Sequence, residues 1–160
     1  MEAVLGAAVA LLDEAGPPAL TFRALAARLG TGVGTIYWYV SNKEELLDRA
    51  TDHAIGGALA AVEERPESDD PIADLRAMAV VLFDAIIDRP WLAAYFMRNT
   101  NMQGNSLRLY EKLGRQTLRL DLSPRQRFHA VSAITGVVVG TAADLGRELP
   151  QELADGDVDR

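Results

Sequence analysis

Two short apolar segments joined by a glycine-rich turn constrain the fold of this 160-residue chain more than any other feature. Residues 21–29 place apolar side chains at helical spacing behind Thr21, which is a suitable N-cap. Gly30-Thr31-Gly32 forms the turn, and residues 33–40 are predicted to form the second short helix. Two short helices in this arrangement make a helix-turn-helix, whose second helix fits the major groove of DNA.

The segments on either side of this unit carry their own helix signals. Residues 3–15 place apolar side chains three and four positions apart, and Gly16-Pro17-Pro18 is predicted to end that helix. Ser41-Asn42-Lys43-Glu44 matches a capping box, in which Ser41 and Glu44 each bond the other's backbone amide. A long helix is therefore expected from Lys43 to about Glu64.

The remainder of the chain contains further helix signals and no convincing strand pattern. Prolines at first helical positions start segments 71–88, 90–98 and 124–146, and residues 107–120 have helical periodicity. We therefore predict an all-α fold: an N-terminal helix-turn-helix head of three helices and a C-terminal helical bundle. Residues 1–46 are predicted to be the DNA-binding domain, and residues 47–160 the ligand-binding and dimerisation domain.

Three consecutive aromatic residues, Tyr37, Trp38 and Tyr39, lie in the second short helix. At helical spacing only Ile36 and Val40, together with one aromatic edge, can face the core. The remaining rings are expected to face outward, where a partner such as DNA would cover them. The alternative is a small aromatic core within the head.

One ordered string of residues runs through the head: residues 20–30 (LTFRALAARLG), 34–40 (GTIYWYV) and 42–47 (NKEELL). This string resembles the DNA-binding signature of the TetR family of transcriptional regulators. The resemblance covers roughly residues 3–50. Beyond residue 50 it is architectural only, and implies a helical ligand-binding and dimerisation domain.

The resemblance implies a set of DNA-binding residues in the head. Thr35, Tyr37 and Lys43 match positions that contact phosphates, and Arg23 matches a position that contacts a base or the backbone. The remaining candidates lie on the groove-facing side or at the start of the first short helix. The full set is Thr21, Arg23, Val33, Gly34, Thr35, Tyr37, Trp38, Tyr39 and Lys43. Without the motif, Arg23 and Lys43 would be interpreted as solvated charges.

The composition disfavours several other classes of protein. A net charge of −7 argues against nucleic-acid binding through bulk charge, although it permits a small DNA-reading face. The chain has no cysteine, which excludes disulfides and fits a cytoplasmic location. His53 and His129 lack metal-ligand spacing, so no metal and no cofactor are expected. The apolar run 130–143 is shorter than a membrane span, so no membrane partner is expected.

Aromatic and methionine residues are frequent in the second half of the chain. Most are expected to belong to the core. As a group they are compatible with an apolar pocket between helices, with amides and one arginine as orienting groups. The predicted ligand-binding residues are Met78, Phe83, Trp91, Tyr95, Arg98, Met102, Tyr110 and Gln116.

The last predicted helix, residues 124–146, is rich in small and β-branched side chains. These side chains pack either inside their own bundle or in a two-fold dimer seam, which we favour. The predicted seam residues are Ala133, Gly136, Val137, Gly140 and Thr141. Gly136 and Gly140 would permit a close approach of two backbones there.

The resemblance to the TetR family implies a ligand-responsive transcriptional repressor rather than an enzyme. A homodimer would bind palindromic double-stranded DNA, and a small apolar or aromatic effector would release it. The alternative is a helical protein-binding module with a weak DNA head. No acid–base pair or nucleophile arrangement favours an enzyme.

Overall fold

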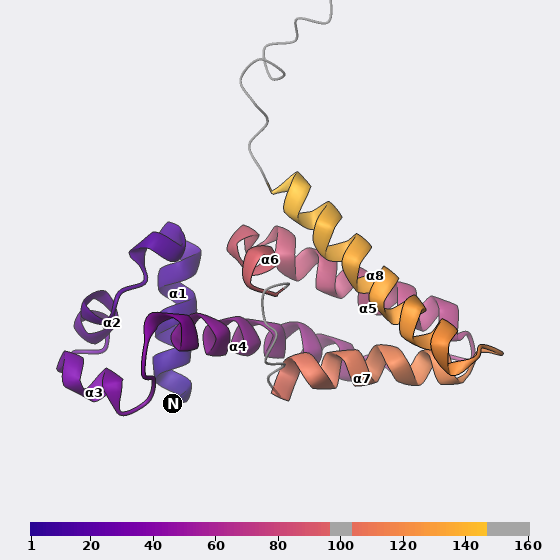
Figure 1. Ribbon diagram of the computed structural model, residues 1–160, viewed down its shortest axis with the longest axis horizontal. Coiled ribbons are helices and arrows are strands. Elements are labelled where there is room, and N and C mark those ends of the chain that lie inside the picture. Colours follow the sequence, from indigo (N-terminus) through magenta and orange to yellow (C-terminus); the bar gives the residue numbers. More distant parts are fainter. Residues whose placement is uncertain (97–103, 147–160) are drawn as a thin grey trace, which may run out of the picture.

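The computed structural model describes residues 1–96 and 104–146, which form eight helices and no strand (Figure 1). The helices are α1 (Glu2–Ala19), α2 (Phe22–Arg28), α3 (Val33–Tyr37), α4 (Lys43–Glu63), α5 (Pro71–Ile87), α6 (Pro90–Phe96), α7 (Gly104–Leu118) and α8 (Pro124–Leu145). The predicted all-α fold is therefore confirmed.

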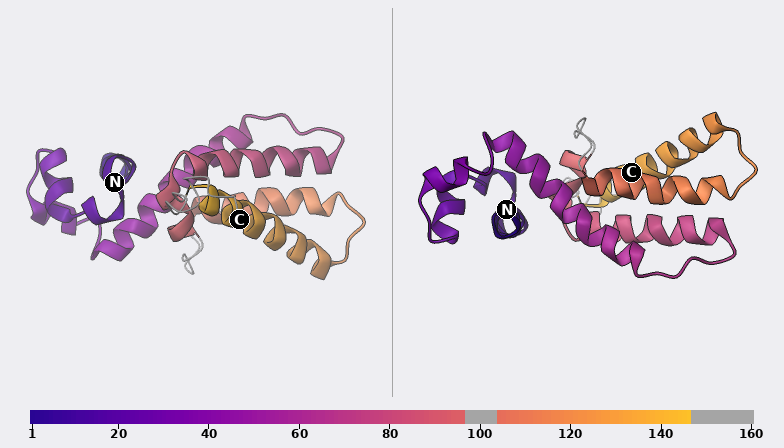
Figure 2. Two further views of the ribbon diagram at one scale, coloured as in Figure 1. Left: turned by 90° about the horizontal axis from the view of Figure 1, so that it is seen from above. Right: turned by 90° about the horizontal axis from the view of Figure 1, so that it is seen from below.

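The molecule is elongated, with the short helices α2 and α3 at one end. Helix α4 runs from this head into a body formed by α5, α6, α7 and α8 (Figure 1). Both views in Figure 2 show the α4–α5 and α7–α8 connections at the end of the body farthest from α2 and α3. A change in the body can therefore reach the head along α4.

Two helix ends in the head differ from the sequence prediction. Gly16 adopts a left-handed φ of 69° and interrupts α1 as expected, but Pro17 and Pro18 then add one more turn. Helix α3 ends at Tyr37 and not at Val40, because the next residues form tight turns onto Thr35 and Ile36.

The cap of α4 lies one residue later than predicted. Asn42, and not Ser41, is the N-cap: its side-chain oxygen accepts from the Glu45 N–H at 2.8 Å. The Glu45 carboxylate in turn accepts from the Ser41 N–H at 2.7 Å. Asn is as good an N-cap as Ser. The two reciprocal hydrogen bonds correspond to those of the predicted capping box, moved one residue along the chain.

The predicted starts of α5 and α8 are confirmed. Asp70 accepts from the Ile72 N–H at 2.8 Å, and Ser123 and Gln126 form a complete capping box. Helix α7 begins at Gly104, earlier than the predicted 107. The Asp52 carboxylate of α4 accepts from the backbone N–H groups of Asn105 and Ser106 at 3.3 and 2.9 Å, which stabilises the first turn.

One hydrophobic core runs through head and body. It joins Leu12 of α1 and Ile36 of α3 to Leu82 of α5 and Leu92 of α6, with Leu46 of α4 between them. All five side chains are at most 2% exposed. Because α4 contributes to both parts, the packing is continuous across the predicted boundary at residue 46.

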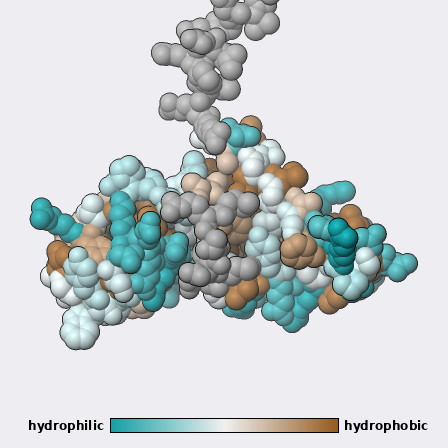
Figure 3. All heavy atoms as spheres, viewed as in Figure 1, coloured by the Kyte–Doolittle hydropathy of each residue, from teal (hydrophilic) through white to brown (hydrophobic). Residues whose placement is uncertain are grey.

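Helix α8 is apolar and largely exposed. By length and composition it is the one helix among the described residues that could cross a membrane. Only 22% of its most apolar stretch is buried in this chain. Figure 3 shows hydrophobic residues along this side of the body. Much of this apolar helix is therefore left uncovered by the rest of the described chain.

Candidate functional site

The head holds α3 in place by two buried side chains and a tight turn. Ile36 and Val40 are 0% and 2% exposed and anchor α3 to the core. Gly30 has a φ of 63°, which favours glycine in the turn between α2 and α3. Thr21 caps α2 by accepting from the Ala24 N–H at 3.1 Å, as predicted.

The aromatic run at the C-terminal end of α3 faces solvent. Trp38 is 89% exposed, Tyr37 60% and Tyr39 38%. Only Tyr37 meets another ring, an edge-on contact with Phe22 at 4.7 Å between centroids. Trp38 is therefore not part of an aromatic core within the head. The one aromatic edge that was expected to face the core belongs to Tyr37, which contacts Phe22.

All nine predicted DNA-binding residues are exposed on the head. The structure therefore leaves them accessible, although it holds no DNA. Thr31 and Thr35 bond to each other through their hydroxyls at 3.0 Å, which orients Thr35 at the start of α3. The Lys43 Nζ donates to the Pro17 carbonyl at 2.9 Å, so this predicted phosphate contact also links α4 to the end of α1.

Arg28 is neutralised by a pairing that local sequence signals do not reveal. Its guanidinium donates twice to the Glu14 carboxylate, both at 2.6 Å. This hydrogen bond lowers the pKa of Glu14 and raises the pKa of Arg28. Fourteen residues separate the two, so only the packing of α1 against α2 brings them together. Arg23 and Lys43 remain as the exposed cations of the predicted set.

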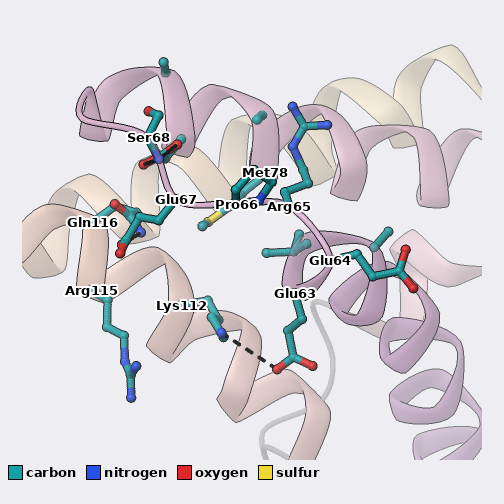
Figure 4. Close-up of a pocket in the computed structure, with 15 residues that line it drawn as sticks. Glu63, Glu64, Arg65, Pro66, Glu67, Ser68, Met78, Lys112, Arg115 and Gln116 are labelled. Carbon is teal, nitrogen blue, oxygen red and sulfur yellow. Dashed lines mark hydrogen bonds and ion pairs between the residues drawn. The ribbon is translucent and has the colours of Figure 1, made fainter.

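The body contains a cavity of about 680 Å³ at the end farthest from α2 and α3. The α4–α5 connection, α5 and α7 form its walls (Figure 4). Met78 and Gln116, both predicted ligand-binding residues, line it. Lys112 also lines it, and sequence reasoning did not identify this residue because a lysine on an amphipathic helix gives no pocket signal.

The other predicted ligand-binding residues do not line this cavity. Phe83, Tyr95 and Tyr110 are half-buried and pack against the main core, and Tyr110 stacks on Phe96 with centroids 6.5 Å apart. Trp91 is 8% exposed, and its indole donates to Asp13 at 2.7 Å. Arg98 and Met102 lie outside the described residues. The described members of the predicted pocket thus fall in two places: Met78 and Gln116 line the cavity, and the others pack in or against the core.

The five predicted seam residues are all exposed on α8. They do not pack inside their own bundle in this chain. A Cβ added to Gly136 or Gly140 would meet nothing within 4 Å. Phe128, Val137 and Leu145 add exposed apolar area along the same helix, at 70%, 68% and 66%. The described part of the chain leaves these three side chains uncovered.

Known proteins share the head sequence and the overall fold of this chain. The family model for bacterial regulatory proteins of the tetR family matches residues 4–50. The structure of a TetR-type transcriptional regulator from Streptomyces coelicolor is 39% identical, with a TM-score of 0.80 over 91% of this chain and 71% of that one. The chain spans about half the length, or less, of the first curated transcriptional regulators it matches.

Two further structures include bound partners. BioQ with its double-stranded DNA operator is 26% identical, with a TM-score of 0.71 over 96% of this chain and 87% of that chain. A TetR variant from Acinetobacter baumannii in complex with minocycline is 25% identical, with a TM-score of 0.77 over 98% of this chain and 83% of that chain. The matched head, the shared fold and the identity to the Streptomyces regulator lead to one conclusion: the chain belongs to the TetR family of transcriptional regulators.

Proposed function

We propose that the protein is a ligand-responsive transcriptional repressor in the cytoplasm, which binds a palindromic DNA operator as a homodimer. The observation that carries the proposal is the set of exposed rings at the end of α3. Trp38 directly follows α3 and is 89% exposed, while Ile36 of the same helix is fully buried. A large ring left in solvent adds little to the core and suits a surface that DNA covers.

DNA binding would use few charges. Arg28 is paired with Glu14, which leaves Arg23 and Lys43 as the cations placed beside α3. Affinity would then depend on α3 side chains and on polar phosphate contacts from Thr35 and Tyr37. Dependence on salt would accordingly be modest for a DNA-binding protein.

Dimerisation would use the exposed face of α8. Gly136 and Gly140 leave room for another helix to approach closely, and Val137 would be buried by it. A two-fold seam presents the same patch from both copies. The two heads would then face successive major grooves, about 34–36 Å apart.

A small, mainly apolar molecule bound between the helices of the body would release DNA. BioQ with its operator and the TetR variant with minocycline show the two kinds of partner in relatives of this fold. The cavity beside Met78 and Gln116 is of a suitable volume for a small molecule. Helix α4, which carries part of that cavity and reaches the head, would transmit the change.

Selection of bound fragments from genomic DNA tests the proposal, followed by titration of the selected site with wild type and Trp38→Ala. The expected result is a palindromic site, with an affinity loss of about tenfold or more in the variant and an unchanged melting temperature. Leu107→Ala, which removes an exposed side chain on α7, is the control. Enrichment of no site would favour the alternative, a protein-binding module with an unused head.

A further inference from the structure

We propose that the cavity at the far end of the body binds an amphiphilic anion: an apolar, preferably aromatic, molecule carrying one acidic group that pairs with Lys112. The expectation that this ligand changes DNA binding rests on the proposed function. Binding of the ligand to the cavity is measured without DNA. The cavity volume of about 680 Å³ lies within the range of small-molecule sites.

The walls of the cavity differ in polarity. Val62, Pro66, Ala73, Ala77 and Met78 provide an apolar side from α4, the connection and α5. Lys112, Arg115 and Gln116 provide a polar side from α7, as Figure 4 shows. A molecule that fills this space must bury apolar surface on one side and satisfy a charge on the other.

The carboxylates around the cavity already have partners. Glu63 accepts from Arg108 at 2.7 Å, and Glu67 accepts from Gln116 at 2.7 Å. Asp74 accepts from Arg119 at 2.8 Å and from the Ser68 N–H. Burial acts to raise the pKa of Asp74, but these hydrogen bonds outweigh it and lower the pKa. A ligand cation would therefore compete with these partners for the carboxylates.

Glu64 and the two arginines of the cavity lining are directed elsewhere. Glu64 and Arg65 point away from α7 in Figure 4. Arg115 pairs with Glu111 at 2.9 Å, one turn back on α7. These groups therefore do not set the charge preference of the cavity.

Lys112 is the cation of the cavity lining with the longest pairing, an ion pair with Glu63 that Figure 4 marks. Its Nζ lies 3.9 Å from Glu63, too far for a hydrogen bond, and that carboxylate already accepts from Arg108. Among the described residues no hydrogen bond from the Lys112 ammonium is found, although its side chain is only 36% exposed. Buried Leu109 and Leu113 fix the α7 backbone on either side of it. An ammonium at the edge of an apolar wall selects an anionic ligand group.

The test uses two fluorescent probes that share one apolar body. Anilinonaphthalene sulfonate carries an acidic group, and phenylnaphthylamine lacks it. Titration of the full chain should show one bound sulfonate probe per chain, with an affinity about tenfold above that of the neutral probe. Lys112→Gln should remove this preference. Arg76→Gln, which removes an exposed cation of α5 outside the cavity, should preserve it.

A third variant locates the probe. Ala73 is exposed at the cavity wall, so the larger side chain of Ala73→Trp would fill the cavity without entering the core. This variant should bind neither probe and should keep the melting temperature of the wild type. Equal affinities of the two probes, an unchanged preference in Lys112→Gln, or binding that survives in Ala73→Trp would each overturn the proposal. Sulfonate binding at this site that leaves operator affinity unchanged would support the site and contradict the ligand-released switch.

Discussion

The indole N–H of Trp91 in α6 donates to Asp13 of α1 across 2.7 Å, and Arg89 Nε donates to the other oxygen of the same carboxylate at 3.1 Å. One carboxylate thus links the first helix of the head to the segment that begins α6. The ring of Trp91 is 8% exposed, so water has little access to replace this acceptor. The pair therefore fixes how head and body are joined.

Asp13→Ala is expected to lower the free energy of unfolding by roughly 1–3 kcal/mol, because it leaves the buried Trp91 N–H without an acceptor. Trp91→Phe removes the donor and keeps an aromatic ring. Chemical denaturation of both single variants and the double variant gives the coupling energy, which should be clearly non-zero. Asp84→Ala, at an exposed carboxylate of α5, is the control. Purely additive losses would show that the hydrogen bond does not contribute.

Lys43→Ala is expected to weaken binding to all DNA sequences alike and to lower the slope of log affinity against log salt by about one. The reason is the loss of one phosphate contact at the start of α4. The bond from Lys43 to the Pro17 carbonyl is exposed, so water can replace it and the melting temperature should change little. Arg65→Ala, at the far end of α4, should leave the slope intact. An unchanged slope in Lys43→Ala would remove this residue from the contact set.

Gly136→Leu is expected to shift the dimer to monomer, because a bulky side chain blocks close approach of two helices at the seam. Within one chain the new side chain has room, since nothing lies within 4 Å of a Cβ at this position. The variant should therefore stay folded by circular dichroism while sedimentation shows the lighter species. Gly57→Leu, on α4, has the same local freedom and should remain dimeric. A dimer that persists in Gly136→Leu would place the seam elsewhere.

Adjacent glycines in α4 are expected to respond differently to alanine. Gly57→Ala should stabilise the protein by about 0.5–1 kcal/mol through helix propensity. Gly56→Ala gains the same propensity, but its Cβ would lie 2.9 Å from Asn105 Nδ2. Asn105 would have to move and release its 3.1 Å bond to the Asp52 carbonyl. Thermal unfolding of the two variants should therefore rank Gly57→Ala above Gly56→Ala, and the reverse order would contradict this packing.

The Glu14–Arg28 pair is expected to make the stability of the head depend on acid pH. The hydrogen bond from Arg28 lowers the pKa of Glu14 below 4.5 in the folded state. Its contribution is therefore present above the unfolded value and is lost as the pH falls through the lower folded value. Wild type should exceed Glu14→Gln in melting temperature at pH 7, with the gap closing below about pH 4.5. Glu64→Gln serves as a control, and a gap that persists in acid would exclude this cause.

The sequence by itself determined the helices and the type of head. Apolar spacing, the Ser123–Gln126 box and the Asp70 cap depend on residues within one turn of each other, and the structure keeps them. The outward direction of Trp38 follows in the same way, because Ile36 and Val40 on either side of it take the core positions. Such local features need no knowledge of how the helices pack.

Only the tertiary structure decided which distant residues meet. Trp91 was predicted to line a pocket, but it lies beside Asp13, 78 residues earlier in the chain. Arg28 has no local signal for a partner, yet it pairs with Glu14 of the preceding helix. The described cavity lies at the far end of the body beside Lys112, a residue with no local signal. The physical reason is that these contacts depend on the angles at which whole helices pack, which the pattern within one helix does not specify.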